Sequence, residues 1–397
     1  MTNLLKPRDA KDVEAAVQWA LADGKTLEVV GHGTKRAIGR AAQWDLSIDV
    51  SGLSAVTLYE PEELVLSAKA GTPVSEIAAL LGAHNQELAF EPMDYGPLLG
   101  TSGGGTIGGA LAANLSGPRR VKVGAARDHF LGFTAVSGRG ETFKSGGRVV
   151  KNVTGYDLCK LLAGSYGTLG VMTDVTVKVL PRAETEETLL VLGLDDAAAA
   201  KAMCAAMGSS NDVSGAAHLP AAVASPATPA GTAVTALRLE GVAPSIAHRL
   251  AALEALLKSF GTLAKLDEDG SRSFWKTVRD VTPFSSGDHV IWRISTAPAR
   301  GHEIVTAIGE GACYYDWAGG LIWFALPPSD DGGAALVRRA TAAIGGHATL
   351  IRAPAAVRAT VPVFAPQDEG VAALTRRIKE SFDPKGVLNA GRMYAGV

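Results

Sequence analysis

The sequence has few cysteines, no block of like charge and no long apolar run. Its three cysteines, Cys159, Cys204 and Cys313, form no CxxC pair, zinc pattern or iron–sulfur motif. We interpret them as buried small side chains of a protein from a reducing compartment, and we expect no metal site. The net charge is −2, from 38 Lys and Arg against 40 Asp and Glu. A nucleic-acid partner is therefore not expected.

No segment predicts a membrane span or a signal peptide. The first residues, MTNLLKPRDAKD, contain no apolar core of the kind that secretory signals have. The longest uncharged run lies between Asp212 and Arg238 and is broken by Pro220, Pro226 and Pro229. This run is too weakly apolar to cross a bilayer, so we interpret it as a loop-like insert and expect a cytoplasmic protein.

Glycine, in contrast, is abundant and clustered. There are 46 glycines, and six of the ten residues from Gly100 to Gly109 are glycine. Further glycine turns occur at 31–33 and 164–170. Glycine tolerates positive φ and lets a ligand approach the backbone, and unpaired N–H groups in such turns form a surface that suits an anion. A Rossmann fingerprint lacks its third glycine in GHGTKRAIG, and no Gly-Lys-Ser/Thr ending marks a P-loop.

Hydrophobic periodicity predicts helices and strands in alternation. Helices are expected at 9–23 and after Thr72, which we take as an N-cap, and strands at 26–30, 46–50, 64–71 and 171–181. After Pro181 the chain becomes Ala-rich, with the strand-like pieces ETLLVLGL, AVTALRLEG, HVIWRIS and GLIWFALP. Helical pieces lie at 196–207 and 246–260. The pattern predicts a first domain that is α+β or α/β and a second α/β domain built on an antiparallel sheet.

Five blocks in order resemble the vanillyl-alcohol-oxidase, or PCMH-type, FAD-binding superfamily. They are VVGHGTKRAIG, GTPVSEI, GGTIGGALAAN, LAGSYGTLGVMTDVTVKVLP and FDPKGVLNAGRMY. Together with VVKNVTGYDLCKLLAGSYGTLGVMTDV and the tryptophan-containing strands, they resemble the E subunits of bacterial glycolate oxidases. The resemblance implies an α+β fold. It comprises a PCMH-type FAD-binding domain of two α/β subdomains at 1–181, a cap domain at 182–370 and a tail at 371–397 that returns to the flavin.

The same resemblance implies which residues hold a non-covalent FAD. The first turn and the glycine stretch would contact the diphosphate and the flavin edge, the third turn would pass the ribose and adenine, Val171 would touch the adenine, and Asn389 would point toward the flavin. The full set is Gly31, His32, Gly33, Thr34, Lys35, Gly104, Gly105, Thr106, Gly108, Gly109, Gly164, Gly167, Gly170, Val171 and Asn389. Valine at Gly105 or Gly108 is expected to abolish flavin retention in a chain that still folds.

Several charged residues admit two interpretations. His32 precedes the position at which covalent family members carry their flavin-linked histidine, where this chain has Thr34, so covalent attachment is not expected. Lys35 and Arg36 either balance the phosphates or are solvated. The arginines of the next cluster either bind a substrate carboxylate or carry structural charge. That cluster is Arg119, Arg120 and Arg127. Tyr166 replaces the glutamate that many relatives have in the third glycine turn.

The C-terminal half lacks the histidine-rich base and metal site of related 2-hydroxy-acid dehydrogenases, so no catalytic residue is assigned. The resemblance implies a subunit that works with a larger homologous flavin subunit and an iron–sulfur subunit, oxidising glycolate or a related acid such as D-lactate. Any place at the inner membrane would come through those partners. Two alternatives stay open: a stand-alone FAD dehydrogenase, and a non-catalytic assembly subunit that keeps the flavin fold.

Overall fold

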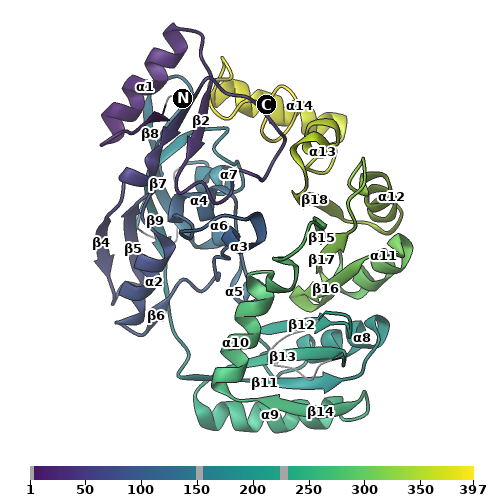
Figure 1. Ribbon diagram of the computed structural model, residues 1–397. Coiled ribbons are helices and arrows are strands. Elements are labelled where there is room, and N and C mark those ends of the chain that lie inside the picture. Colours follow the sequence, from purple (N-terminus) through teal and green to yellow (C-terminus); the bar gives the residue numbers. More distant parts are fainter. Residues whose placement is uncertain (1–3, 149–154, 224–230) are drawn as a thin grey trace. The chain divides into compact units, whose positions relative to one another are not determined.

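The computed structural model describes residues 4–148, 155–223 and 231–397 (Figure 1). The chain forms two compact units, of which unit 1 comprises 1–116, 124–182 and 366–397, and unit 2 comprises 117–123 and 183–365. Part of the block VVKNVTGYDL, residues 149–154, lies outside the described residues. None of the described helices has the length and apolar character that crossing a membrane requires.

Unit 1 begins with a small parallel sheet of order β1-β3-β2, covered by one helix. Asp9 caps that helix by accepting from the backbone N–H of Asp12. Its face of Val13, Val17 and Ala20 is completely buried in an apolar core with the strands. The elements are β1 (Leu4–Leu5), α1 (Ala10–Ala22), β2 (Leu27–Val30) and β3 (Leu46–Asp49). This layer places the end of β2, and the glycine turn that follows it, at the edge of a sheet.

The rest of unit 1 is built on an antiparallel five-stranded sheet of order β4-β5-β9-β7-β8, with a two-stranded sheet formed by β10 and β6. Its strands are β4 (Val56–Glu60), β5 (Val65–Lys69), β6 (Gln86–Glu87), β7 (Phe130–Val136), β8 (Thr142–Gly146), β9 (Val171–Lys178) and β10 (Leu180–Pro181). Its helices are α2 (Val74–Gly82), α3 (Gly96–Leu99), α4 (Ile107–Ala112), α6 (Ala126–His129), α7 (Leu158–Leu162) and α14 (Glu369–Phe382). Helix α4 packs by Ile107 and Leu111 into the core of this sheet.

One expected cap is wrong. Pro73, and not Thr72, occupies the N-cap position of α2. The hydroxyl of Thr72 instead accepts from the N–H of Ala55 at 3.0 Å and donates to the carbonyl of Ala55 at 3.2 Å. The side chain of Thr72 thus links the start of α2 to the segment before β4. A capping pattern in the local sequence does not reveal this contact.

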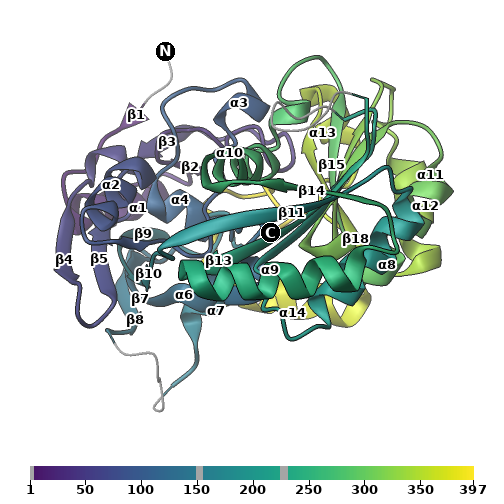
Figure 2. The same ribbon diagram turned by 90° about the horizontal axis from the view of Figure 1, so that it is seen from below.

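Unit 2 contains one eight-stranded sheet of order β14-β11-β13-β12-β16-β17-β15-β18, in which every pairing is antiparallel. Its strands are β11 (Thr185–Leu192), β12 (Gly215–Leu219), β13 (Val234–Gly241), β14 (Thr262–Leu266), β15 (Val290–Ser295), β16 (Ala312–Asp316), β17 (Leu321–Leu326) and β18 (His347–Arg352). Its helices are α5 (Arg120–Val123), α8 (Asp196–Met207), α9 (Ala243–Leu257), α10 (Glu268–Arg279), α11 (Gly301–Ile308), α12 (Ala334–Ile344) and α13 (Ala355–Thr360). Figure 2 shows α9 and α10 on opposite sides of β11.

The expected antiparallel α/β arrangement of this half is therefore present, but the uncharged run from 212 to 238 was interpreted wrongly. It contains the buried strand β12 and the start of β13, and residues 224–230 lie outside the described residues. Alanine has low strand propensity, so the Ala-rich β12 gives little local signal, and pairing with β13 decides its conformation. Residues 117–123 cluster with unit 2, where Gly117 accepts a hydrogen bond from Trp317 Nε1 at 3.0 Å.

Candidate functional site

A cleft in unit 1 brings the glycine turns together. Its walls are Val29 to Arg36, Val50, Ala70, Thr106, Gly108, Gly109, Ala112, Ala113, Tyr166, Gly167, Gly170, Met172 and Arg392. Segments from the start, the middle and the end of the chain therefore meet in one cavity of a single unit.

The first wall is the turn that follows β2. The backbone N–H groups of its five residues, Gly31 to Lys35, donate to no acceptor in the part of the chain that the structure describes. The turn is held from outside by Arg36, whose Nε donates to Glu28 Oε1 at 2.8 Å. Ser47 donates to the other oxygen of the same buried carboxylate at 2.7 Å. A fixed row of unpaired donors is a site for an anion.

The second wall is the glycine stretch before α4. Within the described residues, the N–H groups of Gly104, Gly105 and Thr106 also find no acceptor. His32 Nδ1 lies 3.2 Å from the carbonyl oxygen of Gly104, so this wall is tied to the first turn. The following amides are not available, because those of Ile107 and Gly108 donate to the carbonyls of Thr72 and Ala70. The donor surface is therefore the loop and not the helix terminus.

Two of these glycines are required by protein packing. A Cβ on Gly31 would lie 2.7 Å from Thr106 Oγ1, and one on Gly108 would lie 2.8 Å from both the Cβ and the carbonyl oxygen of Ala70. A side chain at Gly108 thus collides with strand-end backbone before it reaches any ligand. Valine at Gly108 is therefore expected to destabilise the fold, so that loss of flavin in this variant would not report on binding alone. Gly105 differs, since its Cβ would meet only Lys35 Nζ, at 3.0 Å, and Thr34 Oγ1, at 3.7 Å.

The third wall combines the turn at 164–170 with the C-terminal tail. Asn389, fully buried, accepts from the N–H of Val29 at 2.9 Å and donates to the carbonyl of Tyr166 at 2.7 Å. Its amide therefore links two walls of the cleft, and Asn389 is not among the residues that line it; its expected approach to the flavin stays a prediction. Gly167 has φ +74°, and a Cβ there would lie 2.7 Å from Asn389 Nδ2.

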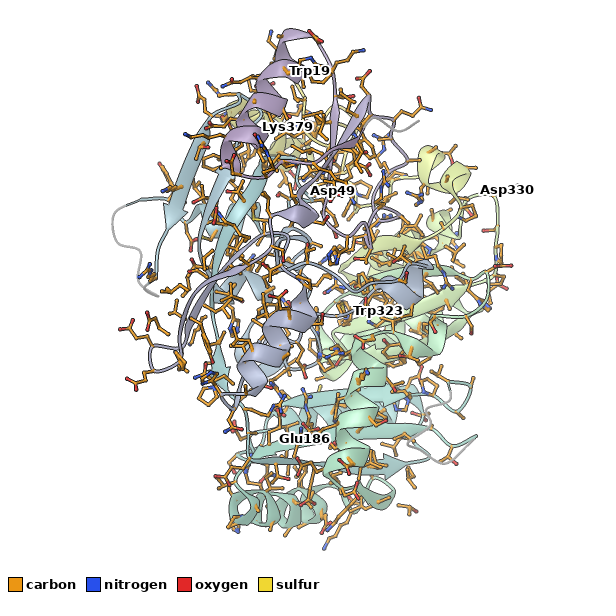
Figure 3. All side chains as sticks on the ribbon, turned by 60° about the vertical axis from the view of Figure 1, so that its left-hand side comes forward. Trp19, Asp49, Glu186, Trp323, Asp330 and Lys379 are labelled. Atoms are coloured by element: carbon orange, nitrogen blue, oxygen red, sulfur yellow. The ribbon has the colours of Figure 1, made fainter. Side chains whose placement is uncertain are left out.

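The tail is anchored by a buried ion pair, Lys379 with Asp383 (Figure 3 labels Lys379). Lys379 Nζ donates to Asp383 Oδ2 at 2.6 Å and to the carbonyls of Thr168 at 2.8 Å and Leu388 at 2.9 Å. The carboxylate also accepts from the N–H groups of Val387 and Leu388, each at 2.8 Å. Burial lowers the pKa of Lys379, although Asp383 opposes the shift.

Most of the residues expected from the sequence meet at this cleft. Lining it are Gly31, His32, Gly33, Thr34, Lys35, Thr106, Gly108, Gly109, Gly167 and Gly170. Gly104 and Gly105 belong to the adjoining donor loop, and Gly164 lies in the turn before Tyr166. Val171 is not brought to the cleft: it is completely buried in the core with Val13, Val17 and Val136. Its neighbour Met172 lines the cleft instead.

Arg392 is the one charged lining residue that sequence reasoning missed. It is 6% exposed, and its guanidinium donates to the carbonyl of Lys35 at 2.8 Å. Its own carbonyl accepts from the N–H of Arg40 at 2.8 Å. The available signal was its place three residues after Asn389 in FDPKGVLNAGRMY.

The three arginines of the cluster have separate environments. Arg119 forms a buried ion pair with Glu240 inside unit 2, where Nε donates to Oε2 at 3.1 Å. Arg127 lies 3.7 Å from Asp128 in unit 1. Arg120 stacks on the Trp317 ring, with its guanidinium carbon 4.1 Å from the ring centre. They do not form one site.

Comparison with known proteins identifies the family. The FAD binding domain family, FAD_binding_4, matches residues 2–146. The chain is 33% identical to glycolate oxidase subunit GlcE of Escherichia coli over 381 residues, covering 96% of this chain and 95% of that one. The chain belongs to the GlcE family. Membership confirms the expected FAD cofactor, the PCMH-type α+β fold and the class of FAD-dependent oxidoreductase subunits.

Other known proteins match part of the sequence or the fold. Over 87 residues the chain is 45% identical to glycolate oxidase subunit GlcD of Bacillus subtilis, which covers 22% of this chain and 18% of that protein. The fold is similar to that of 4-ethylphenol oxidase from Gulosibacter chungangensis, with a TM-score of 0.73 and 12% identity over 99% of this chain and 89% of that one.

The unpaired donors provide an independent test of whether FAD fits. Its diphosphate carries two negative charges. Among the described residues, eight backbone N–H groups have no acceptor, five in the cleft turn Gly31 to Lys35 and three in the adjoining loop Gly104 to Thr106. The cations Lys35 and Arg392 line the cleft. The donor set suits a diphosphate. Within the described residues, no group of three His, Cys, Asp or Glu side chains is placed to hold a metal ion.

Proposed function

We propose that this chain is the E-type subunit of a glycolate oxidase complex and that it binds FAD non-covalently for the oxidation of glycolate, or a related 2-hydroxy acid, to the 2-oxo acid. The observation that carries the proposal is the cleft with its two rows of unpaired N–H donors. The 33% identity to GlcE over almost the whole chain supports the same assignment.

The residues of the cleft would act mainly by holding the cofactor. The turn Gly31–Lys35 and the loop Gly104–Thr106 would donate to the diphosphate, and Asn389 would fix both the end of β2 and the turn at Tyr166. When bound, FAD supplies the acceptor for the electrons of the hydroxy acid. Val29, Val50, Ala70 and Met172 would keep water from the buried part of the cofactor.

The assembly belongs to the proposal as well. A larger flavin subunit homologous to this chain would be one partner, since the match to GlcD shows that D-type subunits share part of its sequence. An iron–sulfur subunit would carry electrons onward, because the three cysteines of this chain are too scattered to bind a cluster. Any association with a membrane would then depend on these partners.

An anaerobic titration of the purified chain with glycolate and D-lactate tests the proposal. The oxidised-flavin band is expected to be present and to stay unbleached in the isolated chain. Bleaching would favour a stand-alone dehydrogenase, and a folded chain that retains no flavin would favour an assembly subunit. A complex assembled with the Gly105→Val chain then shows whether the flavin of this subunit is needed, since turnover at the normal rate would contradict that part of the proposal.

A further inference from the structure

The two cations of the first glycine turn have different partners, although they are adjacent in sequence. Arg36 is committed to Glu28 through Nε at 2.8 Å and through a second contact from its terminal nitrogen to Oε2. Lys35 Nζ makes one hydrogen bond among the described residues, with Thr34 Oγ1 at 3.2 Å, and no ion pair there. Arg36 therefore holds the turn in place, whereas the Lys35 ammonium has no carboxylate partner among the described residues.

The amine of Lys35 lies against the second donor row. It is 3.0 Å from where a Cβ on Gly105 would be and 3.6 Å from where a Cβ on Gly109 would be. The unpaired N–H groups of Gly31 to Lys35 belong to its own turn, and those of Gly104 to Thr106 belong to the loop beside it. A group bound to both rows of amides is thus also next to this ammonium.

The surroundings make the ammonium costly when the cleft is empty of an anion. Burial lowers the pKa of Lys35 to about 8, Asp94 opposes the shift and Arg392 adds to it. Those two groups, from the segment before α3 and from the tail, are the charges that act on the amine, and His32 of its own turn is exposed. A diphosphate diester brings two negative charges and keeps them throughout the alkaline range, so its binding favours the protonated amine.

We propose that Lys35 is the cation that neutralises the FAD diphosphate, and that at alkaline pH the chain takes up one proton at this amine when FAD binds. The inference rests on the proposed FAD site and adds to it separate roles for two neighbouring cations, since Arg36 fixes the turn and Lys35 binds the diphosphate. It also makes FAD affinity dependent on pH. Above the pKa of the empty site, affinity is expected to fall about tenfold for each unit of pH, until the pKa of the occupied site is reached.

Isothermal titration of FAD into the flavin-depleted full-length chain tests this directly. The titration is run at pH 6.5 and pH 9.0, each in two buffers of different ionisation enthalpy, so that the proton count is measured separately from the affinity. Proton uptake is expected to be near zero at pH 6.5 and to approach one at pH 9.0. ADP-ribose, which has the same kind of diphosphate diester but no flavin, should show the same difference in uptake, and riboflavin, which has no phosphate, should show none.

Three variants locate the effect. Lys35→Met should bind FAD at least tenfold more weakly at pH 7 and lose the uptake at pH 9.0. Lys35→Arg should restore the affinity and remove its dependence on pH, because guanidinium stays charged throughout. Lys25→Met, which removes an exposed lysine paired with Asp45 in the same unit, should behave as the unaltered chain.

The failures are distinguishable. If the unaltered chain binds FAD with no proton uptake at pH 9.0, or if Lys35→Met keeps the uptake, the inference is wrong and the proposed FAD site stands. If the folded, unaltered chain binds neither FAD nor ADP-ribose at pH 6.5, the proposed site fails, and this inference fails with it.

Discussion

The buried ion pair between Lys379 and Asp383, which anchors the C-terminal tail, allows the most specific stability prediction. Asp383→Asn keeps the size of a fully buried side chain but removes its charge and turns one acceptor into an NH₂ donor. The new donor would face groups that themselves donate, namely Lys379 Nζ and the N–H of Leu388. The buried ammonium is left without its counter-charge. Breaking one partner of a buried ion pair costs about 3–5 kcal/mol, so we expect a local destabilisation of at least about 3 kcal/mol.

Hydrogen exchange measured by mass spectrometry is the suitable assay, because two units need not unfold together. Peptides covering 383–392 and the end of β2 should exchange about a hundredfold faster than in the unaltered chain, since about 1.4 kcal/mol corresponds to a factor of ten. Peptides of unit 2 serve as the internal reference. Lys25→Met is the matched control, because an exposed pair contributes about 0.2–1 kcal/mol.

The consequence should reach the cofactor. Asn389 can bond to both Val29 and Tyr166 only while the C-terminal tail is packed in its native position, so Asp383→Asn should also lower FAD retention. If exchange in 383–392 stays within about threefold of the unaltered chain, which corresponds to less than about 0.7 kcal/mol, the pair does not hold the tail and this reasoning is refuted.

Three further predictions concern other parts of the chain. Gly105→Val should lose FAD at an almost unchanged melting temperature, whereas Gly108→Val should lower the melting temperature through a clash with Ala70 that costs about 1–3 kcal/mol; differential scanning calorimetry and the flavin spectrum separate the two. Lys35→Met should make the flavin-free chain more stable at pH 7, by up to about 3 kcal/mol, because the pKa of Lys35 in the folded chain, about 8, lies below the ordinary 10.5. For the same reason, urea unfolding of the unaltered flavin-free chain should show stability that rises between pH 8 and pH 10.5, and a flat profile would count against this. Cys204 is exposed, so the interpretation of all three cysteines as buried is wrong for this residue. A thiol reagent at pH 8 should label Cys204 alone in the native chain, because burial raises the pKa of both Cys159 and Cys313 to about 12; labelling of a second thiol before unfolding would contradict this.

Local pattern was enough to predict much of unit 1. The periodicity over 9–23 and the valines of 171–179 mark a helix and a strand whose burial is decided within each element, and α1 and β9 appear there. In unit 2, strands such as β12 depend on neighbours far along the sequence. Thr72 shows the same limit, because its hydroxyl bonds to Ala55 on an earlier segment and not to the helix that it precedes.

The candidate site divides along the same line. Clustered glycines predicted an anion cradle, which stays a prediction; within the described residues the amides of Gly31 to Lys35 have no acceptor. The sequence does not reveal which neighbour of the turn faces the ligand, since Lys35 and Arg36 are equally charged. The two side chains differ in their partners. Glu28 on β2 forms an ion pair with Arg36, and Arg392, from the C-terminal tail, donates to the carbonyl of Lys35.

Glycine count alone therefore mixes two physical requirements. At Gly31 and Gly108 the missing Cβ lets protein pack on protein, and the contacts with Thr106 and Ala70 would exclude a side chain even without any cofactor. Gly104 has a left-handed φ of +64°, and a Cβ there would meet no other atom within 4 Å. A Cβ on Gly105 would lie near only the flexible amine of Lys35 and the hydroxyl of Thr34. A substitution at the first pair reports on folding, and one at Gly105 reports on binding. We therefore expect FAD to bind at the turn before α4, because its backbone N–H groups have no acceptor among the residues that the structure describes.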